Sequence, residues 1–389
     1  MRALFIAHAY PRNEGDPVGS FVLRLATALR GFGIDTEVLA PIAEGLSPND
    51  IIEGIPVHRY RYAPRSMETL AYGGMMSAQV RESWTARLAM LGLLSAGFAA
   101  AARALRARRF DLVHAHWWFP GGLVGSGLRA IARRPLVTTL HGSDVRLARE
   151  VAGGRRAFRF VARASDALTT VSSWLARQAI ELAPSAKPIV APMPVAPGLF
   201  HPGTERADER LLFVGKLTEQ KGLHHVLRAL NAMQARPIVD VVGAGRVDDT
   251  HLRRMAAELG VADRINWLPL MSQADLADRY RQATLHVIPA VDEGLGLTAI
   301  ESLLSETPVV AFDSGGLPDA VIPDGTGILV SPGNVGALAA ALDRLLANPS
   351  ERARLGRQGR ALALSKFSPD AVAARYASIY ADALQHRRG

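Results

Sequence analysis

One stretch, residues 285–311, constrains the fold more than any other part of the chain; it reads LHVIPAVDEGLGLTAIESLLSETPVVA. Two runs with the composition of buried strands, 285–289 and 308–312, flank a glycine-bearing turn and an apolar pattern of helical period. A strand, a loop, a helix and a strand in this order form a βαβ unit, which is typical of a parallel sheet. The stretch therefore predicts an α/β fold.

The same stretch holds two carboxylates, Glu293 and Glu301, around the predicted start of the helix. Gly294 and Gly296 bare the backbone there, and a helix N-terminus favours an anion such as a phosphate. Carboxylates repel that anion, but they accept hydrogen bonds from hydroxyl groups on either side of it. A nucleotide sugar carries a ribose diol, a diphosphate and a hexose in this order, so it fits the pattern.

Two other interpretations of the carboxylate pair stay open. Eight helical residues rise about 12 Å, whereas the catalytic carboxylates of glycosidases lie roughly 5–9.5 Å apart, so a glycosidase pair fits poorly. The two side chains can also be exposed glutamates on an ordinary helix.

The E-x7-E stretch EGLGLTAIE resembles the donor-site motif of the retaining GT-B glycosyltransferases of family 4, in which Glu-Gly-Phe-Gly-Leu is common and Leu295 here replaces the phenylalanine. The resemblance extends over essentially the whole chain. It implies two Rossmann-like domains facing across a cleft, and transfer of a hexose from a UDP- or GDP-sugar to a hydroxyl with retention of configuration. It further implies that Glu301 binds the ribose, that Glu293 binds the donor hexose, and that the acceptor is a sugar or a lipid-linked glycan in polysaccharide or glycolipid biosynthesis.

Length and composition limit the class of protein. A chain of 389 residues with 49% hydrophobic and 21% charged residues suits two globular domains. The absence of cysteine excludes disulfides and thiolate metal sites. Met1 leads directly into an apolar strand without a signal-peptide pattern, so we expect a cytoplasmic enzyme.

The formal net charge of +9 raises nucleic acid, anionic lipid and phosphorylated ligands as partners. The sequence has no zinc knuckle, helix-turn-helix signature or basic-aromatic platform, so we expect no nucleic acid. Residues 88–102 form an uncharged run that is shorter than the ~20 residues of a membrane span. A buried crossover helix is the favoured interpretation; the alternative is a peripheral membrane surface that includes the arginines after this run, which are Arg103, Arg106, Arg108 and Arg109.

The N-terminal half begins as a βαβ unit, with a strand at 2–8, a turn-rich loop, a helix from residue 21 and a strand at 36–40. No G-x-G-x-x-G follows the first strand, which argues against a dinucleotide dehydrogenase. In the resembled family a glycine of this loop lets donor phosphates or acceptor approach the backbone, and Gly19 is its best match. The alternative for Gly19 is a tight turn before a helix.

Two later strand ends carry imidazole and indole side chains. The strand at 111–114 leads into His114, His116, Trp117 and Trp118, whose rings could stack on a sugar. No carboxylate accompanies the two histidines, so we expect no metal. The phrase TLHGSD resembles the cleft histidine motif of the family, which implies that His141 acts near the transferred sugar. Asp144 could orient an acceptor or begin a helix as its N-cap.

The C-terminal half continues with a strand at 211–214, followed by GKLTEQKG. Gly215 opens the turn, and Lys216 and Lys221 place two cations before the next helix, where they could hold a diphosphate. The family usually has arginine at the first site, so Lys216 replaces a bidentate fork with a point charge. Gly243 lies in a turn that resembles part of the wall of the family's nucleotide site. These groups and the helix start at Gly296, Leu297 and Thr298 would stabilise the leaving group without metal or cofactor.

The predicted organisation is an acceptor domain over 1–195, a linker over 196–208, a donor domain over 209–367, and a C-terminal helix over 368–389 that returns to the N-terminal domain. Two alternatives remain: a sugar-nucleotide epimerase or phosphorylase of the same fold, and a basic membrane-surface binding module.

Overall fold

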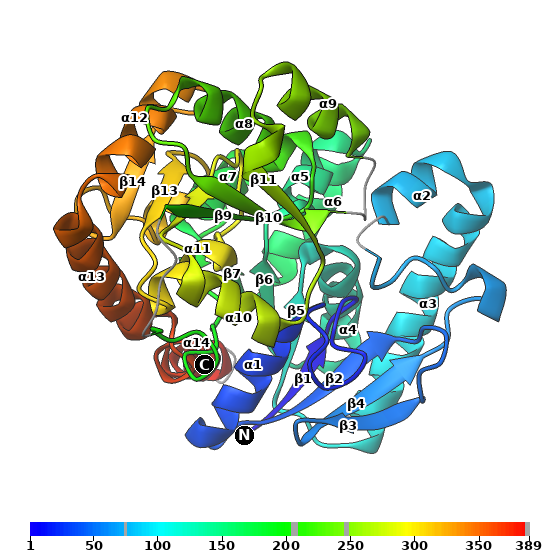
Figure 1. The fold of residues 1–389 in the computed structure, drawn as a ribbon. Helices are drawn as coiled ribbons and strands as arrows, with labels where there is room; N and C mark the ends of the chain where they lie inside the picture. The colour runs from blue at the N-terminus through cyan, green and yellow to red at the C-terminus, as the bar shows by residue number, and fades with distance from the viewer. Residues whose placement is uncertain (74–75, 204–208, 245–248, 386–389) are drawn as a thin grey trace. The chain divides into compact units, whose positions relative to one another are not determined.

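The computed structural model describes residues 1–73, 76–203, 209–244 and 249–385. The chain forms two compact units: the first unit contains residues 1–194 and 369–389, and the second unit contains residues 195–368. Each unit is built on its own sheet with helices packed on it (Figure 1).

The sheet of the first unit has eight strands in the order β3-β4-β2-β1-β5-β6-β7-β8. All neighbouring pairs are parallel except β3 and β4, which form an antiparallel hairpin through the two-residue turn Glu53-Gly54. The strands are β1 (Arg2–Ile6), β2 (Asp35–Pro41), β3 (Asn49–Ile52), β4 (Ile55–Tyr60), β5 (Leu112–His116), β6 (Leu136–Leu140), β7 (Ala167–Thr170) and β8 (Ile189–Val190).

The helices of the first unit include the last one of the chain, which packs against α1. Tyr376 and Tyr380 of this helix are fully buried. The helices are α1 (Ser20–Leu29), α2 (Met76–Glu82), α3 (Trp84–Ala107), α4 (Leu123–Ala132), α5 (Ser143–Glu150), α6 (Gly154–Ala164), α7 (Ser173–Leu182) and α14 (Pro369–Gln385), with short turns at η1 (Arg30–Phe32), η2 (Arg65–Met67) and η3 (Trp118–Gly122).

Helix α3 differs from its prediction. It has 24 residues, so it is about 36 Å long and exceeds the bilayer core; the expectation that this segment is too short to span a membrane is wrong. Among the described residues it is the one helix that is long and apolar enough to cross a membrane. Of its apolar 18-residue stretch, 28% is buried. Its buried side, which includes Ala89, Leu93 and Ala101, packs into the first unit. The prediction of a buried crossover helix is therefore only half right.

The sheet of the second unit has six parallel strands in the order β11-β10-β9-β12-β13-β14. Its strands are β9 (Arg210–Val214), β10 (Ile238–Ala244), β11 (Ile265–Pro269), β12 (Leu285–Ile288), β13 (Val309–Phe312) and β14 (Gly327–Val330). Its helices are α8 (Leu223–Ala232), α9 (Thr250–Glu258), α10 (Gln273–Gln282), α11 (Leu297–Leu304), α12 (Val335–Leu346) and α13 (Pro349–Phe367), with short turns at η4 (Glu219–Lys221), η5 (Ala262–Arg264) and η6 (Leu317–Asp319).

Val195, expected in the N-terminal domain, and residues 196–203, the start of the expected linker, belong to the second unit. The backbone N–H of Val195 donates to the carbonyl of Phe367 at 3.0 Å. The ring of Phe200 is fully buried, and its centroid lies 5.7 Å from that of Tyr280. The other expected linker residues, 204–208, lie outside the described residues.

Candidate functional site

Two glycines lie in close backbone contact at the carboxyl edge of the second sheet. Gly215 follows β9, and its N–H donates to the carbonyl of Val242 in β10 at 3.1 Å. Gly243 has φ 123°, and a Cβ atom there would lie 2.2 Å from the carbonyl oxygen of Gly215. Only glycine permits this approach, so the edge between β9 and β10 presents bare backbone.

The loop after β9 is held against the loop after β12. Gly222 ends η4 with φ 74°, and a Cβ atom there would lie 2.1 Å from the carbonyl oxygen of Pro289. The N–H of Val291 donates to the carbonyl of Gln220 at 3.0 Å. This contact brings Lys221, the last residue of η4, to the segment between β12 and α11.

An ion pair joins the two loops. The Nζ atom of Lys221 contacts Oε2 of Glu293, and the two side chains are 28% and 18% exposed. The backbone of Glu293 is fixed from a third loop, because its carbonyl accepts the N–H of Gly316 at 2.7 Å. The structure therefore brings together two predicted site residues that lie 72 positions apart.

Glu301 lies in a different environment from Glu293. It is 6% exposed in α11, and the hydroxyl of Tyr280 donates to its Oε2 atom at 3.2 Å. Burial, with a smaller effect of the Glu301 carboxylate, raises the pKa of Tyr280 well above 10. The tyrosine therefore stays protonated and orients the carboxylate.

Helix α11 begins only at Leu297, so Glu293 belongs to the loop before it. The helical rise of about 12 Å therefore does not describe the separation of Glu293 and Glu301, and that argument against a glycosidase pair is wrong.

The start of α11 has no side-chain cap. Gly296 is its N-cap residue with φ 81°, and a Cβ atom there would lie 2.7 Å from Cδ2 of Leu317. Leu297 and Thr298 form the first turn and are partly exposed. The N–H groups of a first helical turn have no acceptor inside the helix, so this end of α11 suits an anion. Lys216, the second predicted cation, is exposed on the loop after β9.

In the first unit, His141 follows β6 directly and stacks on a histidine of the neighbouring strand. Nε2 of His141 lies 3.1 Å from Nδ1 of His116, and the ring centroids are 5.3 Å apart. The ring of Trp117 lies 4.5 Å from His141, and the ring of Phe21 lies 5.1 Å from it.

The contact between the two imidazoles sets their tautomers. Burial lowers the pKa of both His116 and His141 well below 6.5, so both rings are neutral and share one N–H. Nε2 of His116 is buried without a hydrogen-bond partner among the described residues. An orphaned buried N–H is rarer than an orphaned acceptor, which favours donation from Nδ1 of His116 and a proton on Nδ1 of His141.

Two predictions for the neighbouring residues are wrong, the position of His114 and the stacking role of the tryptophans. His116 is the last residue of β5, as predicted, whereas His114 lies in the middle of the strand, and both are fully buried. His114 is held by the hydroxyls of Tyr380 and Thr139, at 2.6 and 2.7 Å. Trp117 and Trp118 are 7% and 3% exposed, so their faces are packed inside the unit and do not offer a stacking surface for a sugar.

Asp144 is not the N-cap of α5, which is Gly142, and a contact of Asp144 with the acceptor stays a prediction. Its carboxylate is buried and accepts three backbone N–H groups, from His141 at 3.1 Å, Gly142 at 2.9 Å and Trp118 at 3.1 Å. Burial raises the pKa of Asp144, and these three bonds oppose the shift. Asp144 therefore joins the loops after β5 and β6 and positions His141. The spacing His-x-x-Asp across a strand end is the signal in the sequence.

Gly19 is the N-cap residue of α1, with φ 69°, and a Cβ atom there would lie 2.4 Å from the carbonyl oxygen of Ala9. The close packing of this loop requires glycine, so the tight-turn interpretation holds, and a role toward donor or acceptor stays a prediction. Among the residues that the structure describes, no three His, Asp or Glu side chains are grouped as a metal site would require.

The comparisons with known proteins agree over both units. Two family models match the chain: glycosyltransferase family 4 over residues 18–197, and glycosyl transferases group 1 over residues 200–362. The chain is 32% identical to the MMP alpha-(1->4)-mannosyltransferase of Mycolicibacterium hassiacum, over 94% of each chain. It is 30% identical to the D-inositol 3-phosphate glycosyltransferase of Streptomyces bingchenggensis, over 99% of this chain and 90% of that relative.

Solved structures show the same fold. The sucrose-phosphate synthase of Thermosynechococcus elongatus matches with a TM-score of 0.81 at 21% identity, over 99% of both chains. The Anabaena protein HepE in complex with UDP-glucose matches with a TM-score of 0.72 at 18% identity, over 98% of this chain and 99% of that one. The chain is a glycosyltransferase that belongs to family 4 and has the GT-B fold.

Proposed function

We propose that the protein transfers a hexose from a UDP- or GDP-sugar to a hydroxyl group with retention of the anomeric configuration. The observation that carries this proposal is the ion pair of Lys221 and Glu293. In a nucleotide sugar the anomeric carbon is bonded to the distal phosphate through one oxygen. A carboxylate for the hexose must therefore lie beside a cation for the diphosphate, and the ion pair supplies this adjacency.

The remaining groups of the second unit follow the order of the donor. Glu293 binds hydroxyls of the hexose, and Glu301, oriented by Tyr280, binds the ribose diol. Between them lie the uncapped first turn of α11 and the bare backbone at Gly215 and Gly243, which a diphosphate can approach closely. The relative HepE has been crystallised with UDP-glucose, which supports a donor of this class.

Departure of the nucleoside diphosphate is the difficult step, because negative charge grows on its oxygens. Lys216, Lys221 and the N–H groups at the start of α11 would stabilise this charge without a metal ion. Among the described residues near the predicted sites we assign no base for the acceptor hydroxyl. We therefore propose that its proton passes to the leaving phosphate, on the same face of the sugar. This front-face course retains the configuration. Excess chelator should leave the rate unchanged.

His141 completes the proposed catalytic set. A neutral imidazole can donate a hydrogen bond to a sugar hydroxyl or accept one from it without adding charge. The contact with His116 and the backbone bond to Asp144 hold the ring in one orientation. We propose that His141 positions the transferred hexose.

The proposed acceptor is a sugar or a lipid-linked glycan of polysaccharide or glycolipid biosynthesis. Relatives whose names include mannosyltransferase and D-inositol 3-phosphate glycosyltransferase support a polyhydroxylated acceptor. We place the reaction in the cytoplasm, with a peripheral contact to the inner face of the membrane through α3.

Two measurements test the proposal. Nucleoside diphosphates are screened by thermal shift, and the preferred nucleotide sugar is then supplied with simple sugar acceptors while the anomeric signals of the product are followed by NMR. We expect UDP or GDP to raise the melting temperature and the product to keep the donor's configuration. An inverted product would refute retention. A requirement for free phosphate, or conversion of the donor alone, would identify a phosphorylase or an epimerase instead.

A further inference from the structure

The positive charge of the protein is concentrated in one part of the first unit. Residues 84–164, from the start of α3 to the end of α6, contain 14 arginines, no lysine and only three acids, Asp111, Asp144 and Glu150, for a net charge of +11. The whole chain carries +9, so all other residues together carry −2. A uniformly arginine-rich composition would not produce this distribution, so the cationic character belongs to this segment.

The topology places the helices of this segment in one layer. Helix α3 connects β4 to β5, α4 connects β5 to β6, and α5 and α6 connect β6 to β7, all in the same direction along the sheet. Parallel crossovers are right-handed, so helices that step in one direction cover the same face of the sheet. Helix α3 packs on α4, and α4 packs on α6. We call the outward side of α3, α4 and α6 the arginine face.

The arginine face also exposes large apolar side chains. In α3, Trp84, Leu88 and Leu91 are 69%, 49% and 65% exposed. Their spacing of four and three residues aligns them along one side of the helix. In α6, Phe160 is 54% exposed and lies beside Arg159. Aromatic and aliphatic side chains mixed with arginine are the composition of a surface that lies in a lipid interface.

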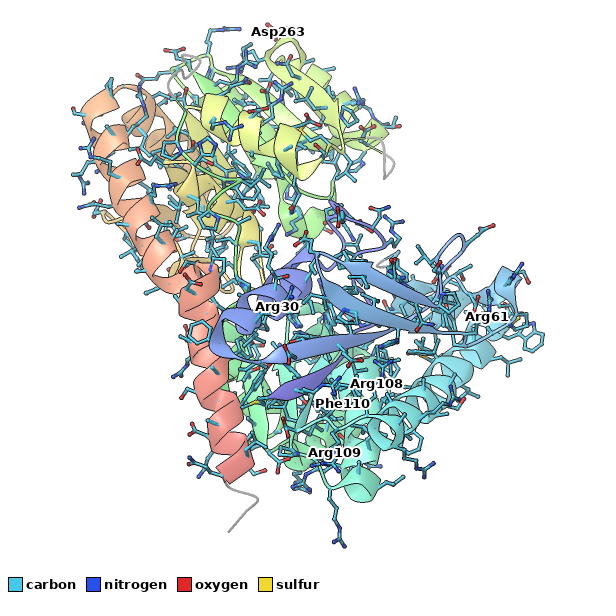
Figure 2. The ribbon with its side chains drawn as sticks, turned by 90° about the horizontal axis from the view of Figure 1, so that it is seen from below. Arg30, Arg61, Arg108, Arg109, Phe110 and Asp263 are labelled. Atoms are coloured by element: carbon cyan, nitrogen blue, oxygen red, sulfur yellow. The ribbon has the colours of Figure 1, made fainter. Side chains whose placement is uncertain are left out.

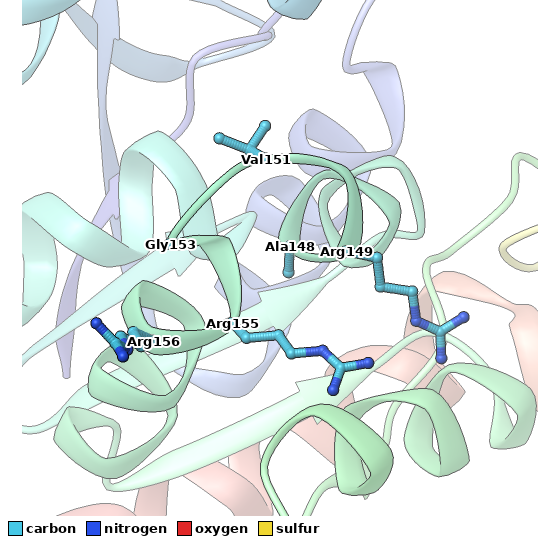
Figure 3. Close-up of a pocket in the computed structure, with 6 residues that line it drawn as sticks. All are labelled: Ala148, Arg149, Val151, Gly153, Arg155 and Arg156. Atoms are coloured by element: carbon cyan, nitrogen blue, oxygen red, sulfur yellow. The ribbon is translucent and has the colours of Figure 1, made fainter.

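The arginines at the start of α6 lie where the local electrostatic potential is unfavourable for a cation. Arg155 and Arg156 lie in the first helical turn, where the positive end of the dipole disfavours cations. With Arg149, which forms an ion pair with Glu181, they line a surface pocket of about 360 Å³ between α5 and α6. In Figure 3 the side chains of Arg149 and Arg155 extend in the same direction and that of Arg156 extends in the opposite one. Cations placed at a helix N-terminus at a cost in stability indicate that this surface binds an anionic ligand.

Further arginines lie where the helices of the face end. Figure 2 shows Arg108 and Arg109 beside Phe110, directly after α3. Arg133 and Arg134 follow α4 and are exposed. Cations at helix C-termini are favoured by the dipole, so these residues need no ligand to explain them. Arg108 forms an ion pair with Glu37, whereas Arg109, Arg133 and Arg134 extend the positive field of the face.

We propose that the arginine face docks the enzyme on an anionic lipid bilayer, with Trp84, Leu88, Leu91 and Phe160 in the interface and the arginines against lipid phosphates. The exposed apolar stripe favours lipid over nucleic acid, because it would gain nothing from a polyanion in water. The inference rests on the peripheral membrane contact of the proposed function and names its surface and its lipid class.

Flotation of the full-length protein tests the proposal, with vesicles of phosphatidylcholine alone and vesicles that also contain phosphatidylglycerol. We expect binding only to the anionic vesicles, and weaker binding as salt screens the charges. The double variant Arg155→Gln/Arg156→Gln should bind about 30-fold more weakly. Its melting temperature should not fall, because the change removes cations from a helix N-terminus.

Matched variants test whether vesicle binding depends on the arginine face or on charged and apolar side chains anywhere on the surface. Arg254→Gln/Arg357→Gln removes two exposed arginines of the second unit and should bind like wild type. Leu91→Ser should weaken binding, whereas Ile51→Ser, at 68% exposure in β3, should not. Equal losses in the paired variants, equal binding to neutral vesicles, or tighter binding to a short DNA duplex would each overturn the proposal.

The same preparations are assayed for UDP and GDP binding by thermal shift. Intact nucleotide binding without flotation removes only the docking inference. Flotation without nucleotide binding removes only the proposed donor site.

Discussion

The carboxyl edge of the second sheet carries glycines and an ion pair, whereas the same edge of the first sheet carries imidazole and aromatic rings. In the second unit, Gly215 and Gly243 bare the backbone, and Lys221 pairs with Glu293. In the first unit, the ring of His141 packs against those of His116 and Trp117, and the buried carboxylate of Asp144 accepts hydrogen bonds from backbone N–H groups. Two sheets of one general type therefore support different chemistry, because loop residues decide what each edge binds.

Acid should distinguish the two units most strongly. Burial lowers the pKa of His8 to about 4, and it lowers those of His114, His116 and His141 well below 6.5. These rings are neutral in the folded protein, so below pH 6.5 the unfolded state binds more protons than the folded state. The free energy of unfolding therefore decreases as the pH is lowered. A group shifted like His8 contributes a loss of about 3 kcal/mol by pH 4.

The second unit has fewer histidines of this kind, mainly His286, with a pKa lowered to about 3, and His225, with one lowered to about 4. Asp144, with its raised pKa, offsets part of the loss in the first unit. We expect hydrogen exchange, measured by mass spectrometry between pH 7 and pH 4, to accelerate in β5 before β12. Replacement of the exposed His201 by Gln should change neither profile. Earlier opening of β12 would contradict this order.

Loss of Glu293 should have the largest effect on turnover. Glu293→Ala removes the proposed hexose partner and leaves Lys221 without its carboxylate, so kcat should fall by about 10³-fold while calorimetry still detects nucleoside diphosphate. Glu219→Ala, an exposed acid in the nearby turn η4, serves as the control and should keep most activity. Near-normal transfer by Glu293→Ala would show that the edge of the second sheet does not hold the sugar.

Loss of Lys221 should act on binding more than on fold. Lys221→Ala should weaken the affinity for UDP or GDP by roughly 10- to 100-fold, because it removes a charged hydrogen bond and leaves Glu293 to repel the phosphates. Isothermal calorimetry measures the change. Lys366→Ala, which removes an exposed lysine from α13, should bind normally. Unchanged affinity in Lys221→Ala would remove this residue from the phosphate site.

The smallest effect is expected at His116, which positions His141 in the first unit. His116→Leu should lower kcat by about tenfold, because the loss of a single oriented hydrogen bond is worth about 1.4 kcal/mol. His116→Asn keeps a polar group near the position of Nδ1 and should recover most of the rate. Nitrogen NMR of the His141 ring should show its tautomer shift in the leucine variant alone. An unchanged tautomer would reduce His116 to a packing residue.

Local patterns predicted most strands, since runs such as 211–214 and 309–312 are continuous apolar segments between turn residues. The hairpin of β3 and β4 escaped prediction, because its strands are short and half exposed and only the turn Glu53-Gly54 marks it. The length of α3 was underestimated, since Arg87 and Arg103 interrupted an apolar run whose helix continues past both. The roles of Asp144 and Trp118 were missed, because they depend on bonds between loops from different strands.

Contiguous motifs such as EGLGLTAIE identify the family, the alternation of strands and helices, and the residue types at the proposed donor site. The three-dimensional fold sets which charges meet. Lys221 pairs with Glu293, and Tyr280 with Glu301, because parallel strands bring their following loops to one edge of the sheet. It also decided that the arginines of α3, α4 and α6 share one face, because handed crossovers and not sequence distance place successive helices side by side.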